Sequence, residues 1–225
     1  MKRSCMVLTL LLSALWLHGG DTAVFVDLGF SADGRTYMFG QYGVDPGTLR
    51  PWAELAAVDV ASNSFVPGGR VGYIHDSAVA AGHDGAGALY RVIARNTALA
   101  DRCRIGYLLQ GHPLYVSMEN HVSAGGETIE FRDFEKAASF RAVLRDSASP
   151  EGSSFVISLE RRAVDGSTRT YTAGSASIRR PGIIAYRIRR VLAAPNGSLV
   201  FVIEMKKQNS DGSVDIRYMV ETLKL

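Results

Sequence analysis

Cysteine is scarce in this chain of 225 residues, which contains only Cys5 and Cys103. Cys5 lies before the apolar run at the amino terminus, so removal of that segment leaves one thiol and excludes an intramolecular disulfide. Cys103 follows a helical pattern of apolar residues, which favours a buried structural thiol over a reactive one. The apolar core must therefore stabilise this protein without a covalent cross-link.

Excess charge of one sign is also scarce. The formal net charge is +3, and Lys2 and Arg3 of the amino-terminal segment contribute to it. A chain so close to neutrality offers no bulk electrostatic attraction for phosphate backbones. We therefore expect no nucleic-acid partner.

Long apolar runs are limited to one, at residues 6–17, directly after the basic Lys2 and Arg3. A basic start followed by about a dozen apolar residues is typical of a secretory signal, and the run is too short to cross a bilayer as an ordinary helix. An uncleaved anchor is the alternative. We predict a signal peptide at residues 1–20, a single β-rich domain at residues 21–225 and no transmembrane segment after cleavage. The mature protein is expected in the periplasm or outside the cell.

Catalytic and metal-binding motifs are missing as well. The chain has no P-loop, no G-x-G-x-x-G, no H-E-x-x-H and no G-x-S-x-G. The pairs His75-Asp76 and His83-Asp84 contain residue types that bind zinc, but their spacing fits no standard zinc motif. We interpret them as exposed loop residues, and we expect neither a metal nor another cofactor.

A paired-carboxylate site is one alternative, and its candidates are Glu127, Glu130, Asp133 and Glu135. Glu130 alternates with Ile129 and Phe131, as a solvent-facing residue of a strand does. A pocket that gathers two or more of Glu119, Glu127, Glu130 and His121 would favour an enzyme.

The β pattern begins directly after the signal. "AVFVDLGF" (23–30) and "TYMFGQY" (36–42) are β-prone and flank "SADGR" (31–35), whose Asp33-Gly34 pair favours a structural hairpin turn. "WAELAAVDV" (52–60) and a short strand at "FVP" (65–67) complete a predicted antiparallel meander.

One helix interrupts the strands. Apolar residues that include Leu89, Val92 and Ile93 recur at spacings of three and four, which predicts an amphipathic helix near residues 85–103. From Pro113 onward the period returns to two, and turn clusters such as "VDGS", "APNG" and "QNSDGS" separate the candidate strands. The predicted fold class is therefore mainly β: antiparallel sheets, sandwich-like or blade-like, with one embedded helix.

Two resemblances follow from these motifs. "FSADGR", an aromatic strand and a strand ending in "VDV" resemble one blade of a TolB-type β-propeller. A complete propeller needs at least four such units at a fixed period, and the echoes here are irregular, so one hairpin unit inside another β fold is preferred.

Together with the signal, "GFSADGRTYMFGQYGV", "AELAAVDVASNSFVPGG" and the C-terminal "APNGSLVFVIE" resemble the bacterial family of predicted secreted proteins catalogued as domain of unknown function 2259. That resemblance implies export and a β-rich fold, and it brings no known activity.

Two surface features are candidate ligand-binding sites. Tyr42, Arg50 and Trp52 flank a Gly/Pro loop, and exposed aromatic and arginine side chains are common in recognition surfaces. Arg187 and Arg189 belong to an arginine-rich strand and are expected to share a face that meets an anionic group. The alternatives are a core role for Trp52 and a solvated, edge-protecting role for the arginines.

Two functional hypotheses remain. The preferred one is a non-enzymatic binding or interaction module of the cell envelope, whose partner is an envelope protein or an anionic envelope polymer. The other is a cell-envelope hydrolase with an acidic site that the sequence does not identify.

The mature amino terminus is the first testable prediction. Amino-terminal sequencing of exported protein should find a start near residue 20, with a cut after Gly19, because His18 and Asp21 occupy the −3 positions of cuts after Gly20 and Ala23. Exported protein that still begins at Met1 would contradict cleavage.

Overall fold

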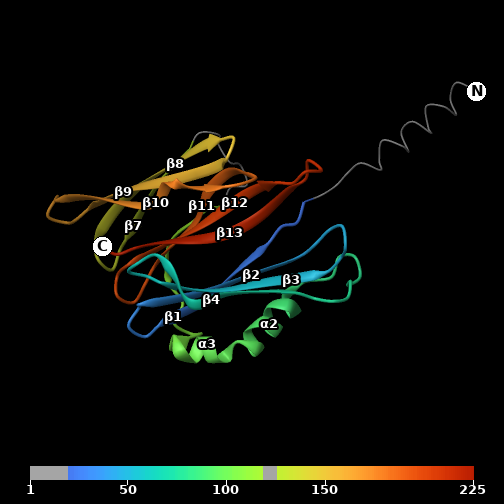
Figure 1. The fold of residues 1–225 in the computed structure, drawn as a ribbon. Helices are drawn as coiled ribbons and strands as arrows, with labels where there is room; N and C mark the ends of the chain where they lie inside the picture. The colour runs from blue at the N-terminus through green and yellow to red at the C-terminus, as the bar shows by residue number, and fades with distance from the viewer. Residues whose placement is uncertain (1–19, 119–125) are drawn as a thin grey trace, which may run out of the picture.

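The computed structural model describes residues 20–118 and 126–225. Three antiparallel sheets are stacked on one another, and two short helices cover the free face of the first sheet (Figure 1). The predicted fold class, mainly β with antiparallel sheets, is therefore confirmed, and the sheets lie one on another as layers.

The first sheet is the predicted meander. It consists of β1 (Val24–Ser31), β2 (Thr36–Val44), β3 (Pro51–Asp59) and β4 (Ser64–Ile74), with the two-residue β5 (Ile105–Gly106) added beside β1. The short strand predicted at 65–67 is wrong, because β4 continues to Ile74. β4 is an edge strand, and proline is tolerated there because its missing N–H would face solvent. Pro67 therefore does not end β4.

Two helices, α2 (Ala86–Arg95) and α3 (Thr97–Arg102), replace the single predicted helix. The break falls at Asn96, whose side-chain amide donates to the Val92 carbonyl at 2.8 Å. Its backbone N–H donates to the Ile93 carbonyl, three residues back. Asparagine interrupts helices in this way because its side chain competes with the backbone hydrogen bonds. Leu89 of α2 packs on the first sheet, and the Cys103 thiol is free and half-buried at the margin of the same core.

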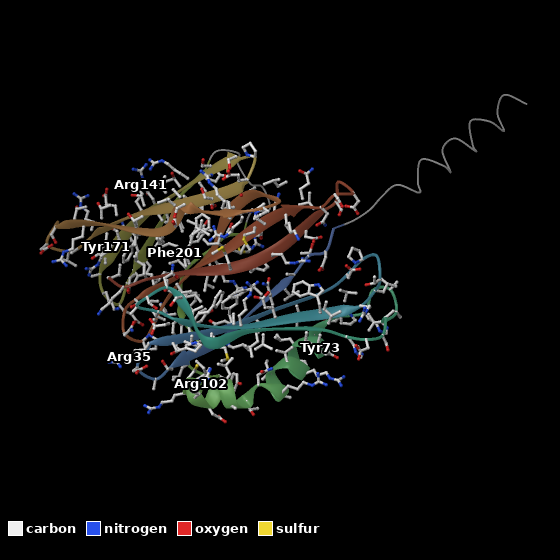
Figure 2. The ribbon with its side chains drawn as sticks, in the orientation of Figure 1. Arg35, Tyr73, Arg102, Arg141, Tyr171 and Phe201 are labelled. Carbon is white, nitrogen blue, oxygen red and sulfur yellow. The ribbon has the colours of Figure 1, made fainter. Side chains whose placement is uncertain are left out.

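The central sheet is buried on both faces. It consists of β6 (His112–Val116), β11 (Ile183–Ala193), β12 (Leu199–Gln208) and β13 (Val214–Leu223), in the order β13-β12-β11-β6. Phe201 (labelled in Figure 2) and Ile203 of β12 belong to the core shared with the outer sheet, whereas Val200 and Val202 belong to the core shared with the first sheet. Strands that are covered on both faces read as continuous apolar runs, and "LVFVI" is such a run.

The outer sheet covers the far face of the central sheet. It consists of β7 (Glu127–Asp133), β8 (Ala138–Ser149), β9 (Gly152–Arg162) and β10 (Thr168–Arg180), joined in sequence order. Phe155, Ile157 and Leu159 of β9 belong to the core that this sheet shares with the central one. The three sheets thus enclose two apolar layers, and the helices enclose a third.

The two ends of the described chain meet at β13. Thr22 forms a parallel bridge with Ile216. The Ile216 N–H donates to the Asp21 carbonyl at 2.8 Å, and the Ala23 N–H donates to the Ile216 carbonyl at 3.1 Å. A cut after Ala23 would remove these contacts, whereas the predicted cut after Gly19 preserves them.

The sequence predicts no transmembrane segment after cleavage. Within residues 20–118 and 126–225, no helix is both long enough and apolar enough to span a bilayer.

The first hairpin turn docks on a distant turn. Asp33 accepts hydrogen bonds from the Ser31 hydroxyl at 2.7 Å and the Arg35 N–H at 3.1 Å, and Gly34 has a φ of +66°. Asn196, in the turn between β11 and β12, donates from its side chain to the Gly34 carbonyl at 2.9 Å. The Asp-Gly pair thus makes the predicted turn and also joins the first sheet to the central one.

The contact between Asn196 and Gly34 predicts that two alanine substitutions lower the free energy of unfolding by different amounts. Gly34→Ala and Gly166→Ala should each lose about 1 kcal/mol of unfolding free energy, because both residues have positive φ. Gly34→Ala should lose roughly 1 kcal/mol more, since its Cβ would lie 2.8 Å from the Asn196 Cγ, whereas nothing lies within 4 Å at Gly166. Urea unfolding of both variants measures the difference, and equal losses would contradict the docking.

Candidate binding cleft

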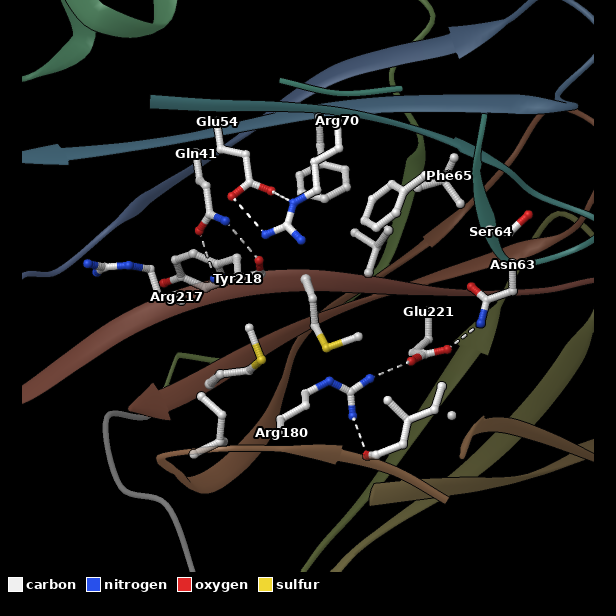
Figure 3. Close-up of a pocket in the computed structure, with 18 of the residues that line it drawn as sticks. Gln41, Glu54, Asn63, Ser64, Phe65, Arg70, Arg180, Arg217, Tyr218 and Glu221 are labelled. Atoms are coloured by element: carbon white, nitrogen blue, oxygen red, sulfur yellow. Dashed lines mark hydrogen bonds and ion pairs between the residues drawn. The ribbon is translucent and has the colours of Figure 1, made fainter. Parts of the chain in front are cut away.

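A cleft of about 610 Å³ lies where one edge of each sheet reaches the same side of the molecule. β4, β13 and β10 are those edge strands, and β13 lies between the other two (Figure 3). Apolar side chains from all three sheets line it, among them Val58, Phe65, Ile178, Met205 and Met219.

A polar pair fixes the end of the cleft next to the first sheet. Arg70 of β4 contacts both carboxylate oxygens of Glu54 on β3, with its Nε at 2.5 Å and its Nη2 at 3.2 Å. Two parallel hydrogen bonds of this kind hold a guanidinium and a carboxylate in one plane. Glu54 is therefore engaged by its neighbouring strand and is oriented along the cleft wall.

A second pair lies on the side of the outer sheet. The Arg180 Nη2 is 3.7 Å from the Glu221 Oε1, and the Asn63 side-chain amide donates to the other carboxylate oxygen. Glu221 is only 4% exposed, and this burial raises the pKa of its carboxyl. The Asn63 hydrogen bond and the Arg180 charge lower that pKa in part. The Arg180 guanidinium also lies over the Phe155 ring, 5.1 Å from its centroid.

Two amide side chains cap the free edge of β13. Gln41 accepts from the Tyr218 N–H at 2.8 Å and donates to the Tyr218 carbonyl at 3.1 Å, as a peptide unit of a paired strand does. Asn63 accepts from the Thr222 N–H at 2.7 Å. Exposed strand edges invite pairing with other chains, and here the protein pairs part of the edge with its own side chains.

A hollow beside the cleft contains two of the predicted site residues, Arg50 and Trp52. The Trp52 indole N–H donates to the Asp21 carboxylate, and the Arg217 guanidinium lies 4.4 Å from the centroid of the Trp52 ring. Arg217 also contacts Asp21 at 3.0 Å. Burial raises the pKa of Asp21, while the charge of Arg217 lowers it. Trp52 therefore joins the amino-terminal segment to β13 as well as lining the hollow.

The other predicted site residues lie apart from this hollow. Tyr42 packs with the core beneath α2, where burial and then Asp84 raise the pKa of its hydroxyl. Arg187 is only 3% exposed. It donates to the Ser117 hydroxyl and lies 3.8 Å from Glu127.

Arg189 lies 3.6 Å from Glu204 of β12. The register of β11 against β12 shifts between Ile188 and Arg190, which interrupts the simple alternation of faces. The structure thus brings Arg50 and Trp52 together and leaves Arg187 below the surface.

Two acidic residues of β7, Glu127 and Glu130, contact arginines. Glu130 pairs with Arg141 at 3.7 Å, and Glu127 accepts from the Ile188 N–H at 2.8 Å as well as contacting Arg187. Glu119 and His121 lie outside the described residues. Across residues 20–118 and 126–225, no group of three or more His, Cys, Asp or Glu side chains is placed to hold a metal.

Sequence reasoning missed Gln41, Asn63 and Glu221. One signal was present: Gln41 is a polar residue at a buried position of an apolar strand, and a buried amide needs partners. Asn63 lay within an ordinary turn cluster, and nothing local distinguished it.

The fold and the cleft together define a layered antiparallel β protein with a cleft between its sheet edges. A family model described as predicted secreted protein (DUF2259) matches residues 38–224, and the chain belongs to this family. Membership supports export and confirms the resemblance seen in the sequence. Comparison with the curated proteins and with the solved structures finds no match.

The buried Glu221 predicts a pH-dependent stability. Because its folded-state pKa is raised above the ordinary 4.5, its contribution is complete below that ordinary value and is lost as the pH rises through the folded-state pKa. Glu221→Gln cannot titrate, so the substitution should be more damaging at about pH 4 than at about pH 8. Urea unfolding of both proteins at the two pH values measures this. A difference that does not change with pH would contradict the raised pKa.

Proposed function

We propose that this exported chain is a non-enzymatic binding protein of the cell envelope, and that the cleft between β4, β13 and β10 holds its ligand. The observation that carries the proposal is the lining of the cleft: apolar side chains from three sheets lie between two fixed ion pairs. Ligand sites are typically concave and mostly apolar, with a few polar groups that fix orientation.

The state of the carboxylates favours binding over catalysis. A general acid or base must reach the proton that it transfers, and both Glu54 and Glu221 are engaged by an arginine. Glu221 has Asn63 as a further partner. These groups are arranged to hold the walls of the cleft and to orient a ligand.

The charge of the cleft indicates the kind of ligand. Four cationic side chains line it, against the two carboxylates of Glu54 and Glu221. The cationic residues are Arg70, Arg180, Lys207 and Arg217. Arg70 and Arg180 pair with the two carboxylates of the cleft, and Arg217 pairs with Asp21 and Asp215, so Lys207 is the one of the four with no ion pair among the described residues. A cation without a carboxylate partner favours an anionic group on the ligand, which agrees with an envelope protein with an acidic segment or with an anionic envelope polymer.

A hydrolase is the second candidate, because a buried carboxyl with a raised pKa, such as Glu221, can serve as a proton donor. Incubation with purified envelope polymer separates the two functions. Release of soluble fragments by the wild type, and its loss in Glu221→Gln, would favour the hydrolase, whereas binding without release favours the proposal.

Two matched substitutions test the cleft. Phe65 lines it and is 50% exposed, whereas Phe134 does not line it and is 85% exposed. Aspartate at either position should leave the melting temperature nearly unchanged, because exposed sites tolerate substitution. Immobilised wild type and Phe134→Asp should retain the same component of an envelope extract, and Phe65→Asp should retain at least tenfold less.

Mass spectrometry of the eluted material provides the readout. Equal retention by all three proteins would place the ligand outside the cleft. Equal loss in both variants would show a nonspecific effect of the added charge, and either result contradicts the proposal.

A further inference from the structure

We propose that the ligand is an extended acidic polypeptide segment, and that one of its residues pairs in β fashion with the main chain of Val220 in β13. This inference rests on the proposed function and specifies the ligand of the same cleft. Its basis is the hydrogen bonding along the outer edge of β13.

The outward direction of the Val220 peptide groups follows from the strand period. Ile216, Tyr218 and Thr222 all direct their N–H groups away from β12, toward Asp21, Gln41 and Asn63. In an antiparallel strand, alternate residues direct their peptide groups to the same side. The N–H and the carbonyl of Val220, midway between Tyr218 and Thr222, therefore also point outward, into the cleft.

Val220 differs from its neighbours on this edge. Among residues 20–118 and 126–225, no side chain and no turn or loop residue bonds its outward N–H or carbonyl, and the β-ladder that contains Val220 is the one with β12. Peptide groups on the free edge of a sheet are available for pairing with another chain. Pairing with a ligand main chain would satisfy both groups at once.

The protein itself shows that an amide fits this edge. The Gln41 side chain exchanges two hydrogen bonds with Tyr218, at 2.8 Å and 3.1 Å, which is the exchange expected between paired strands. Asn63 approaches Thr222 from the same side. The two amides are separated by about 13 Å of strand, so a ligand can pair with β13 over a single residue.

The side chains around Val220 define the rest of the ligand. Phe65 lines the cleft from the first sheet, and Ile178 and Met219 line it from the outer and central sheets. Extended peptides place successive side chains on opposite sides, so apolar residues on both sides of the pairing residue would each meet an apolar wall. Lys207, which has no ion pair among the described residues, favours an acidic residue toward one end of the ligand. β-strand addition of this kind takes its affinity from the main chain and its specificity from such pockets.

The test uses the processed, exported protein and a display library of random nine-residue peptides. The strongest binders are synthesised, and their affinity is measured by fluorescence polarisation. Methylating each peptide nitrogen in turn should weaken binding at least tenfold at one position and less than threefold at the others. The selected peptides should be apolar in the middle and acidic at one or both ends.

Variants of the protein provide the complementary test. Val220→Pro removes the outward N–H while the inward ladder with β12 is retained, which an edge strand tolerates. It should bind the peptide at least tenfold more weakly than Val220→Ala, which keeps the N–H. If Val220→Pro does not fold, the methylation series decides by itself. In the wild type, the Val220 amide should exchange its hydrogen more slowly once peptide is bound.

Several results would overturn this inference while the proposed function stands. One such result is that the wild type and Phe134→Asp retain an envelope component, Phe65→Asp does not, and no peptide binds. Another is a peptide that no single methylation weakens, or that Phe65→Asp still binds at full strength. Dimerisation of this chain through β13, abolished by Val220→Pro, would identify a second copy as the occupant instead. Loss of the envelope component in the cleft comparison would overturn the proposed function itself.

Discussion

Strand β12 carries apolar side chains on both faces, and the rest of the fold depends on covering each of them. Phe201 faces the outer sheet and Val202 faces the first sheet. A sheet with one apolar face needs one covering layer, and a sheet with two needs two. The first sheet is itself apolar on its far side, where Met38 and Leu55 pack against α2. The layers therefore follow one another until the helices present a polar surface to water.

The stack also brings three edge strands to the same side. Edge strands present unpaired main-chain groups, which natural proteins cover, charge or twist away. β13 is partly covered by Thr22 and by the amide side chains of Gln41 and Asn63. The cleft occupies the part of this side that the protein does not cover, so the site results from the way the sheets are stacked and not from an added loop.

Local patterns in the sequence predicted local structure. The hairpin at 23–42 was predictable because Asp33-Gly34 determines a turn between two β-prone runs, and the later strands were predictable from their period and turn clusters. The extent of β4 and the break at Asn96 were not, because each depends on neighbouring strands or on a side-chain hydrogen bond.

The cleft lay beyond sequence reasoning for the same reason. Gln41 meets Tyr218 across 177 residues, and Asn63 meets Thr222 across 159. No periodicity specifies such pairs. Arg187 shows the opposite error: alternation suggested a surface residue, yet it is buried and contacts Ser117 and Glu127. Its burial depends on partners from other strands.

The bridge between Thr22 and Ile216 determines when this protein can finish folding. It joins residues near the two ends of the described chain, and the Asp21 N–H donates to the Asp215 carboxylate across 194 residues. Contacts of such long range form slowly, because the entropy cost of closing the long loop comes before the contact compensates for it. A chain that crosses a membrane with its amino end leading delivers β13 after the strands β1 to β12 that precede it. The amino-terminal segment therefore lacks its partner strand until β13 has crossed, and this contact between distant parts of the chain forms after the hairpins that are local in sequence.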